Sequence, residues 1–311
     1  MRRPRSRPEV SAARSSLCVG GRSRTFTTIT SPTTRAGAAL VLVLPGGFQS
    51  GAGFRRFSGY SFDRFAVESG AVVTYLDGYR RNWSDIELSG PRRARRAPGE
   101  DIAFISAVID EFTRSGQVDP KRVFVIGFSA GGWMAMRLLR DLPERIAGAA
   151  VLSGGEQAPG EPPGRRPPGR AVPVVFFHGT GDRQVPYQGG RAGVWRMRSG
   201  RAGLSTTTMV ARHAARNGIT TPPTIVRLPH DPTPDPTRIE LTEYRQDGHA
   251  PIALYSVIGG GHVVPGPTPA TRLAGRTTTR IDAVDAIGAF FHLPPQPTRI
   301  EPSVPVARED E

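Results

Sequence analysis

The stretch that decides the fold is Arg-Val-Phe-Val-Ile-Gly-Phe-Ser-Ala-Gly-Gly, residues 122–132. Its first half is a run of β-branched and aromatic residues, which is typical of a strand buried on both faces of a parallel sheet. Its second half is Gly-x-Ser-x-Gly, and a helical apolar pattern continues from it to Leu139. A serine between such a strand and such a helix sits in a tight turn that makes its hydroxyl project above the sheet. Ser129 is therefore the first candidate for a nucleophile.

On both sides of this stretch, short apolar runs alternate with amphipathic segments. The runs at 39–44, 71–76, 149–152 and 172–177 have the length and composition of buried strands. The alternation predicts an α/β fold with a mostly parallel central sheet and helices on both faces. Further strands are expected at 24–29, 225–228, 238–245 and 253–258, and helices at 62–69, 101–116, 205–217 and 280–292.

The composition is strongly basic. The chain has 311 residues, of which 38% are hydrophobic, and a net charge of +14. Lys121 is the single lysine, and the arginines are spread along the chain and are most frequent in Gly/Pro-rich stretches. This distribution argues against a specific nucleic-acid surface, which concentrates its charge on one face. No apolar run approaches the ~18 residues that span a bilayer, so no membrane span is predicted.

Composition also suggests where the folded domain begins and ends. Residues 1–22 are predicted to form a disordered basic arm, 23–293 a single domain, and 294–311 a Pro-rich tail with an acidic end. Within the domain, 156–171 is nearly all Gly, Pro, Arg, Ala and Glu and is interpreted as a flexible insertion without a packing role. The basic start is not followed by an apolar core, so an export signal is not expected unless the true start codon differs. The single cysteine, Cys18, excludes an intrachain disulfide and a cysteine metal cluster.

Two further strand ends supply the partners that a nucleophilic serine needs. Such a serine requires a base, and the base requires a carboxylate that fixes its tautomer. Asp182 follows the strand at 172–177, and His262 follows the strand at 253–258 after three glycines. Because ligands on parallel sheets bind beyond the carboxyl ends of the strands, these side chains are expected to meet Ser129 there.

Other acids and histidines fit this arrangement less well. Asp235 and Asp247 stay open as substitutes for Asp182. Asp77 also follows a strand but precedes the serine, which breaks the expected order. His178 ends a strand, yet it precedes Asp182 too closely to bond it as a triad partner, so we expect a structural role for His178.

An oxyanion hole is expected beside the serine. The N–H of Ala130, directly after the nucleophile, is one donor. The second donor is expected from the loop at 45–49, where Pro45 has no N–H, so Gly46 or preferably Gly47 must supply it.

Aromatic residues near these loops are candidates for the rim of a substrate pocket. Aromatic side chains there favour aryl esters or apolar acyl chains, although Trp133 has the alternative of packing in the core from its helix. The basic run at 92–96 is interpreted as a solvated loop, with attraction of acidic substrates as the alternative. The candidates are Phe48, Trp83, Trp133 and Tyr187.

Taken in order, several segments resemble one esterase family, that of polyhydroxybutyrate depolymerases and feruloyl or acetylxylan esterases, which have the α/β-hydrolase fold. The resemblance covers roughly residues 20–292 and implies that Ser129 is the nucleophile, Asp182 the orienting acid and His262 the base. The segments are 44–50, 101–109, 118–123, 127–132, 178–187 and 259–262.

The chain departs from the family pattern in three respects. Pro45 stands where the family usually has histidine, and Val263-Val264-Pro265 stands where an aromatic residue and proline are common. The export signal and disulfides of the family are also missing from the sequence as written. A cytoplasmic location follows from the sequence itself, and an extracellular one from the habit of the family.

These observations together predict a serine carboxylic-ester hydrolase that works through an acyl-enzyme. Its substrate is expected to be a small-molecule or polymer ester, and neither metal nor organic cofactor is implied. One alternative is an acyltransferase that uses the same triad. The other is an inactive, arginine-rich protein that binds anions or nucleic acid. The oligomeric state is not predicted.

Overall fold

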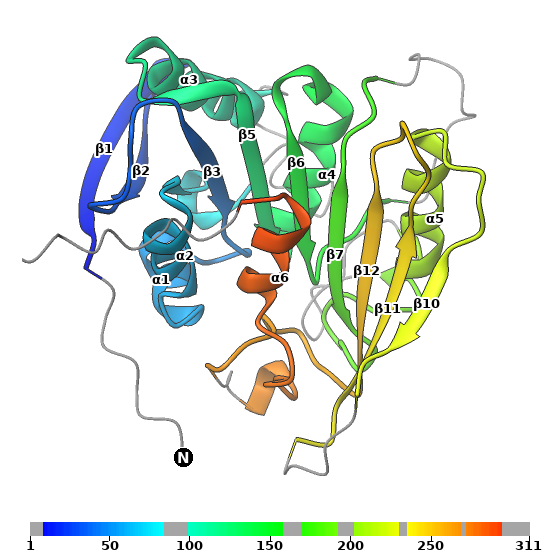
Figure 1. The fold of residues 1–311 in the computed structure, drawn as a ribbon. Helices are drawn as coiled ribbons and strands as arrows, with labels where there is room; N and C mark the ends of the chain where they lie inside the picture. Colours follow the sequence, from blue (N-terminus) through cyan, green and yellow to red (C-terminus); the bar gives the residue numbers. More distant parts are fainter. Residues whose placement is uncertain are drawn as a thin grey trace, which may run out of the picture.

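A twisted ten-stranded sheet runs through the protein (Figure 1), and its centre is parallel, as predicted. The computed structural model describes residues 9–83, 99–157, 169–191, 202–229, 235–268 and 272–293. The strand order is β1-β2-β4-β3-β5-β6-β7-β12-β11-β10, in which neighbours from β4 to β12 are parallel and the flanking pairs are antiparallel. The strands are β1 Ser11–Val19, β2 Arg22–Thr30, β3 Ala38–Leu44, β4 Val72–Leu76, β5 Val118–Phe128, β6 Gly148–Leu152, β7 Val174–Gly179, β10 Thr224–Arg227, β11 Arg238–Tyr244 and β12 Ile252–Ile258.

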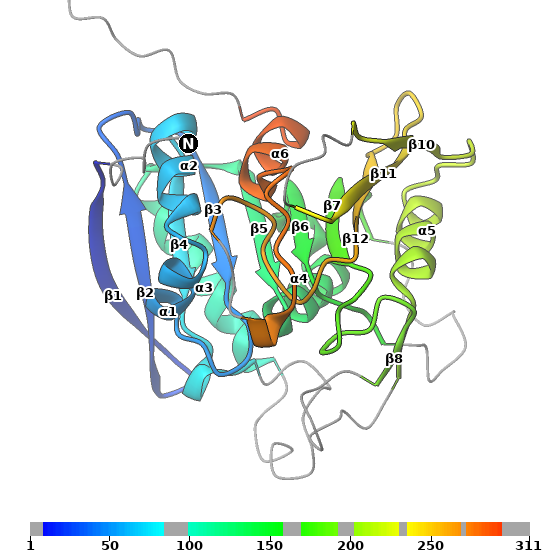
Figure 2. The ribbon, with the colours of Figure 1, turned by 90° about the horizontal axis from the view of Figure 1, so that it is seen from below.

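Helices cover both faces of this sheet, which is why its central strands are apolar throughout (Figure 2). Every residue of β3 is buried, and successive residues alternate between two core clusters. Leu40 and Leu42 pack toward α3, α4 and α5, whereas Val41 and Val43 pack toward α1, α2 and α6. The helices are α1 Gly51–Phe57, α2 Ser61–Ser69, α3 Glu100–Arg114, α4 Ala130–Asp141, α5 Thr206–Arg216 and α6 Ala283–Phe290. The short elements are η1 Tyr79–Arg81, η3 Pro143–Arg145, η4 Arg272–Ala274 and the strand pair β8 Gly190–Arg191 with β9 Ala202–Gly203.

The prediction that residues 1–22 form a disordered arm is wrong for its second half. Residues 11–19 are strand β1, which pairs antiparallel with β2 across a two-residue turn at Gly20-Gly21. Both glycines have positive φ, 58° and 72°, as a tight hairpin turn requires. Leu17 and Val19 are half-buried against the core, so this strand extends the folded domain. Residues 1–8 lie outside the described residues.

The ends of the predicted insertion at 156–171 also pack, contrary to expectation. Gln157 bridges to Gly203, and the Leu204 N–H donates to the Glu156 carbonyl at 2.8 Å. The Glu156 carboxylate lies 3.5 Å from the His213 ring nitrogen. Residues 158–168, most of the basic loop that contains 92–96, and the tail at 294–311 lie outside the described residues.

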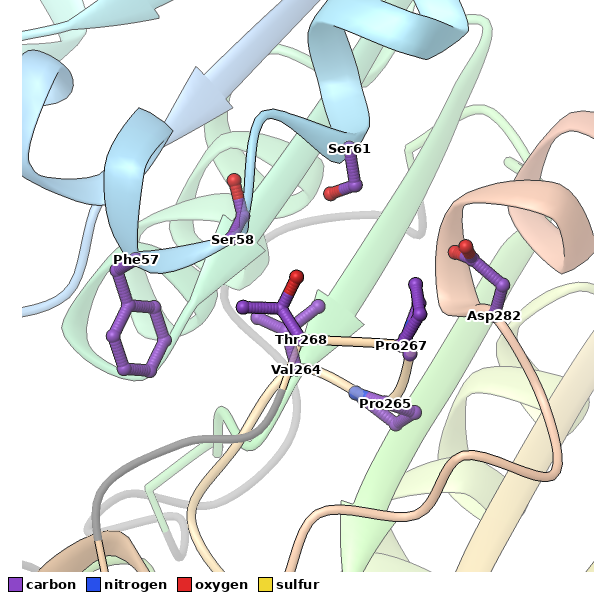
Figure 3. A pocket seen from close by; sticks show the side chains of 9 residues that line it. Phe57, Ser58, Ser61, Val264, Pro265, Pro267, Thr268 and Asp282 are labelled. Atoms are coloured by element: carbon purple, nitrogen blue, oxygen red, sulfur yellow. The ribbon is translucent and has the colours of Figure 1, made fainter. Parts of the chain in front are cut away.

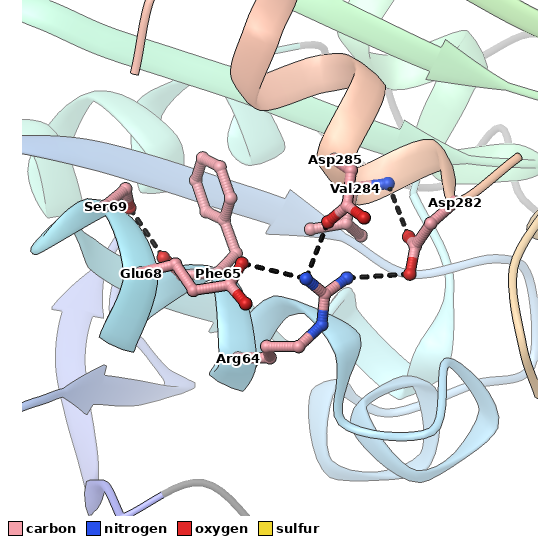
Figure 4. A network of polar contacts seen from close by, with 7 residues as sticks. All are labelled: Arg64, Phe65, Glu68, Ser69, Asp282, Val284 and Asp285. Carbon is pink, nitrogen blue, oxygen red and sulfur yellow. Dashed lines mark hydrogen bonds and ion pairs between the residues drawn. The ribbon is translucent and has the colours of Figure 1, made fainter. Parts of the chain in front are cut away.

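Helix α6 is held by one arginine from the other half of the chain (Figure 4). Arg64 of α2 donates to Asp282, at 2.7 Å, and to Asp285, at 2.6 Å, and it also bonds Glu68 of its own helix. Asp282 is the N-cap of α6, since its other oxygen accepts the Val284 N–H at 3.0 Å. A single guanidinium therefore fixes the start of the helix that follows the loop of His262.

Candidate active site

Ser129 lies in a strained turn at the carboxyl end of β5, directly before α4. Its φ of 53° and ψ of −119° are a conformation that non-glycine residues rarely adopt. The Ser129 N–H donates to the Leu152 carbonyl of β6 at 2.9 Å, and its own carbonyl accepts the Trp133 N–H. These backbone bonds hold the turn, so the hydroxyl is presented beyond the edge of the sheet.

The glycines around the serine are required by close contacts between backbones. A Cβ on Gly127 would lie 2.2 Å from the Gly131 carbonyl oxygen. A Cβ on Gly131 would lie 2.0 Å from the Leu44 carbonyl oxygen at the end of β3. Both distances are far below contact, so helix α4 can start this close to the sheet only without these side chains.

Asp182 and His262 are brought together although 80 residues separate them. The Asp182 carboxyl is fully buried on the loop after β7, and its Oδ2 lies 2.7 Å from His262 Nδ1. Its other oxygen accepts the backbone N–H groups of Gln184, at 2.8 Å, and Val185, at 2.9 Å. Burial alone would raise the pKa of the Asp182 carboxyl, but its bonds with His178 and His262 outweigh this and hold that pKa well below its usual range. The carboxylate is therefore charged at neutral pH.

The loop after β12 directs His262 back toward the serine. The His262 N–H donates to the Ala274 carbonyl at 2.6 Å, and the Gly261 N–H to the Arg276 carbonyl. The His262 ring lies 5.0 Å, between centroids, from the ring of Phe128, the residue before Ser129. Within the described residues no hydrogen bond joins the Ser129 hydroxyl to this ring. Such bonds are often long before substrate binds.

The loop of His262 is seated on the turn between α1 and α2 (Figure 3). Gly59 in that turn has a φ of 63°, and a Cβ on it would lie 1.9 Å from Thr268 Oγ1. A small cavity of about 10 Å³, room for one water, remains between this turn and residues 264–268. The buried Ser61 hydroxyl, which has no partner among the described side chains, borders this cavity. A larger hollow of about 660 Å³ lies between α2 and α6, and none of Ser129, Asp182 and His262 lines it.

Two backbone N–H groups next to the serine are available to an oxyanion. Gly47 and Ala130 lie side by side, because a Cβ on Gly47 would be 3.6 Å from that of Ala130. Ala130 is the first residue of α4, so its N–H has no acceptor inside the helix. In the part of the chain that the structure describes, the Gly47 N–H has no backbone acceptor either. The arrangement can stabilise negative charge beside Ser129.

Of the four predicted rim aromatics, only Phe48 is on the surface. Its side chain is 66% exposed, next to Gly47. The prediction is wrong for Trp133 and Tyr187, which are buried. Trp133 packs in the core against Gly155 and Gly203, which was the alternative reading of this residue. The Tyr187 hydroxyl bonds Ser256 at 2.8 Å.

The fourth predicted rim residue, Trp83, is only 1% exposed and instead holds the loop that contains Gly47. Its indole N–H donates to the Pro45 carbonyl at 2.8 Å. The Phe48 N–H donates to the Arg81 carbonyl at 2.7 Å, so residues 81–83 fix both ends of the loop that contains Gly47. The sequence contained a signal for this role, since an indole inside a fold usually finds a hydrogen-bond acceptor.

Trp83→Phe is expected to lower kcat by about 10-fold. Losing an oxyanion donor outright costs about 10²–10³ in kcat, and here the Gly47 donor is displaced rather than removed. The measurement is kcat for a short p-nitrophenyl ester. Trp133→Phe is the matched control, because the buried Trp133 indole nitrogen has no partner among the described residues. Equal rates in both variants would contradict a role for Trp83 in holding the loop.

The competing acids are engaged elsewhere. Asp235 accepts from Thr237, Thr278 and Thr279, and these bonds outweigh desolvation and lower its pKa to about 2. Asp247 is exposed, and Asp77 accepts the Gly51 N–H and the Thr25 hydroxyl. His178, for which a structural role was expected, is buried with its Nε2 3.4 Å from Asp182 Oδ2.

A strand-turn-helix serine, a buried acid–imidazole pair and two adjacent N–H groups at the carboxyl edge of a parallel sheet are the arrangement typical of the α/β-hydrolase fold. Residues 73–210 match the family described as Phospholipase/Carboxylesterase. The acetyl xylan esterase from Aspergillus awamori has the same fold, with a TM-score of 0.59 and 16% identity over 90% of this chain and 99% of that one.

Sequence relatives match shorter portions of the chain. NocK of Nocardia uniformis subsp. tsuyamanensis is 37% identical over 176 residues, 56% of this chain and 49% of that protein. Feruloyl esterase B of Piromyces equi is 30% identical over 210 residues, 66% of this chain and 36% of that enzyme. The chain thus spans half or less of the length of these curated relatives.

The described residues contain neither a metal-binding cluster nor a helix that could span a membrane. No group of three or more His, Cys, Asp or Glu side chains there is arranged to hold a metal ion. None of the helices in those ranges combines the length and apolarity needed to cross a bilayer.

Proposed function

We propose that this chain is a serine carboxylic-ester hydrolase in which Ser129, Asp182 and His262 form the catalytic triad. The observation that carries the proposal is the 2.7 Å bond between Asp182 and His262 at the sheet edge where the strained turn presents Ser129. Relatives named as esterases and the match to the Phospholipase/Carboxylesterase family support the same reaction.

The proposed reaction has two halves. His262 Nε2 takes the Ser129 proton as the oxygen attacks the ester carbonyl, and the Gly47 and Ala130 N–H groups bind the oxyanion. The alcohol leaves with the proton from His262, and water then hydrolyses the acyl-enzyme by the same route in reverse. The bond from His262 Nδ1 to Asp182 keeps Nε2 free to accept a proton, and the buried carboxylate stabilises the imidazolium.

We infer that the substrates include esters that carry an aryl group or a short acyl group. The exposed Phe48 side chain beside Gly47 offers an aromatic surface to the substrate. Two of the relatives are named feruloyl esterase and acetylxylan esterase/xylanase. Esters of hydroxybutyrate enter the proposal only through the resemblance in sequence.

An ester panel tests the proposal. The purified chain is expected to hydrolyse short p-nitrophenyl esters and at least one of methyl ferulate and acetylated xylan, with hydroxybutyrate oligomers in the same panel. Activity is expected to fall as the pH is lowered from 8 to 5, because a protonated imidazole cannot act as the base. Product release is measured across pH 5–8. An absence of hydrolysis with every ester, or a flat pH profile, would overturn the proposal.

A further inference from the structure

A second imidazole lies against the carboxylate that holds His262. His178, the penultimate residue of β7, is 3% exposed. Its Nε2 lies 2.8 Å from the Val185 carbonyl oxygen and 3.4 Å from Asp182 Oδ2, the oxygen that also bonds His262 Nδ1. Asp182 Oδ2 is thus placed between two histidine rings.

The partners of His178 determine which of its nitrogens carries the proton. The Val185 carbonyl can only accept, so Nε2 must be the N–H donor. In a neutral ring Nδ1 is then an acceptor, and the Thr206 hydroxyl, 3.0 Å away, can donate to it. Thr206 is the first residue of α5 and is 2% exposed, so helix α5 fixes this neighbour of the ring, whereas Val185 lies on the loop after β7.

The bond to Val185 acts on the turn that holds Asp182. The N–H of Val185 donates to Asp182 Oδ1, while its carbonyl accepts from His178. His178 therefore contacts both Val185, the residue that donates to Asp182 Oδ1, and the other carboxylate oxygen, Oδ2. This leaves one orientation in which Oδ2 points at His262.

We propose that His178 is a positioning residue, which fixes the rotation of the Asp182 carboxylate so that Oδ2 meets His262 Nδ1. The proposal rests on the proposed roles of Asp182 and His262. In metalloenzymes, removing a group that orients a metal-ligating side chain costs about 10–100-fold in activity or metal affinity, and we take the same scale for a group that orients Asp182. We therefore expect losses in kcat of that size, with the substrate affinity left unchanged.

Titratable groups from several elements of the described chain surround this cluster. They are His178 at the end of β7, His262 after β12, and Tyr187 on the Asp182 loop, whose ring lies 5.6 Å from that of His178. Burial, and to a smaller extent the charge of Glu240 on β11, raises the pKa of the Tyr187 hydroxyl. A change at His178 that frees the Asp182 carboxylate would stabilise the His262 imidazolium less. The acid limb of the activity profile would then move to lower pH.

A matched pair of amides tests the proposal. Glutamine is long enough to place an N–H near the position of Nε2, whereas asparagine ends near the position of Nδ1. We expect His178→Asn to lower kcat about 10–100-fold with KM changed less than about threefold, and to move the acid limb down by about half a pH unit or more. We expect His178→Gln to restore most of the rate and the position of the limb. His213→Asn and His213→Gln, at a buried histidine paired with Glu156, are controls that leave both unchanged.

A readout that needs no turnover separates this proposal from the proposed function. The Nδ1–H proton of His262, followed by NMR in the resting protein, should keep its hydrogen-bonded downfield position in wild type and in His178→Gln. It should shift or disappear in His178→Asn, while the thermal melt stays cooperative. A wild type without esterase activity would overturn the proposed function alone, because the NMR comparison would still decide the role of His178. Equal kcat and equal NMR spectra for both His178 variants would overturn the positioning role.

Discussion

Ser129→Ala is expected to lower kcat by at least ~10³ while the protein keeps its fold. The three residues of a triad act as a unit, so loss of the nucleophile leaves only the rate enhancement due to binding and to the oxyanion hole. The measurements are kcat for a p-nitrophenyl ester and covalent labelling by a fluorophosphonate, which should disappear.

Ser153 provides the matched control for this experiment. It follows β6, is 1% exposed and also has a positive φ, 47°, and its hydroxyl has no partner among the described residues. Ser153→Ala is expected to keep both rate and labelling. Full labelling of the Ser129→Ala variant would show that another residue is the nucleophile.

Asp182→Asn is expected to lower kcat by roughly 10³–10⁴, the range seen when the carboxylate of such a triad becomes an amide. The amide nitrogen cannot accept the proton of His262 Nδ1, so the imidazole is held in the wrong tautomer for taking the Ser129 proton. The measurement is kcat/KM at neutral pH. Asp235→Asn, at the alternative acid whose carboxylate accepts from Thr237, Thr278 and Thr279, is expected to keep kcat. A larger loss from Asp235→Asn than from Asp182→Asn would contradict the triad.

The same substitution also tests the charge state of Asp182. Its pKa is lower in the folded protein than the ordinary value of about 3.9. The charged carboxylate therefore contributes stability that is complete above the unfolded pKa and is lost as pH falls toward the folded one. The difference in melting temperature between wild type and Asp182→Asn should accordingly be largest near neutral pH and should shrink below about pH 4.

The sheet and the site differ in how far the sequence predicted them. Buried strands were recognisable because both of their faces are apolar, as in β3 and β4. Strand β1 was missed because it lies at an edge and is largely exposed, which leaves no apolar pattern. The signal that could have found it is Gly20-Gly21, the two-residue turn that joins it to β2.

Helix α1 was missed for a different reason. Gly51 and Gly53 lower its intrinsic helix propensity, whereas its actual start is specified by Ser50, whose hydroxyl accepts the Gly53 N–H at 3.1 Å. Gly51 is required there because a Cβ would lie 2.9 Å from Tyr75 Cβ. Packing against β4 thus overrode local preference.

The candidate site was predictable where chemistry and strand ends coincide, as at Asp182 and His262. The surroundings were not, because a burial pattern cannot say which way an aromatic side chain turns. Tyr187 lies on the same loop as Asp182, and Trp83 was expected near the loop of Gly47, yet both rings are buried. Likewise, the sequence did not predict that the side chains of His178 and Asp182 lie 3.4 Å apart, because the turn at 182–185 creates this approach.

The guanidinium of Arg64 has a consequence for the order in which the molecule becomes competent during synthesis. The turn of Ser129 depends on β3, β5 and β6, all of which have emerged once residue 152 is made. Strand β12 and the helix that begins at Asp282 come more than a hundred residues later, and that helix is anchored to Arg64, 218 positions earlier in the chain. Non-local closure of this kind is the slow part of folding. Under the proposed roles, Ser129 is expected to be in place well before His262, and a ribosome-bound chain that has not reached Asp282 is expected to lack hydrolytic activity.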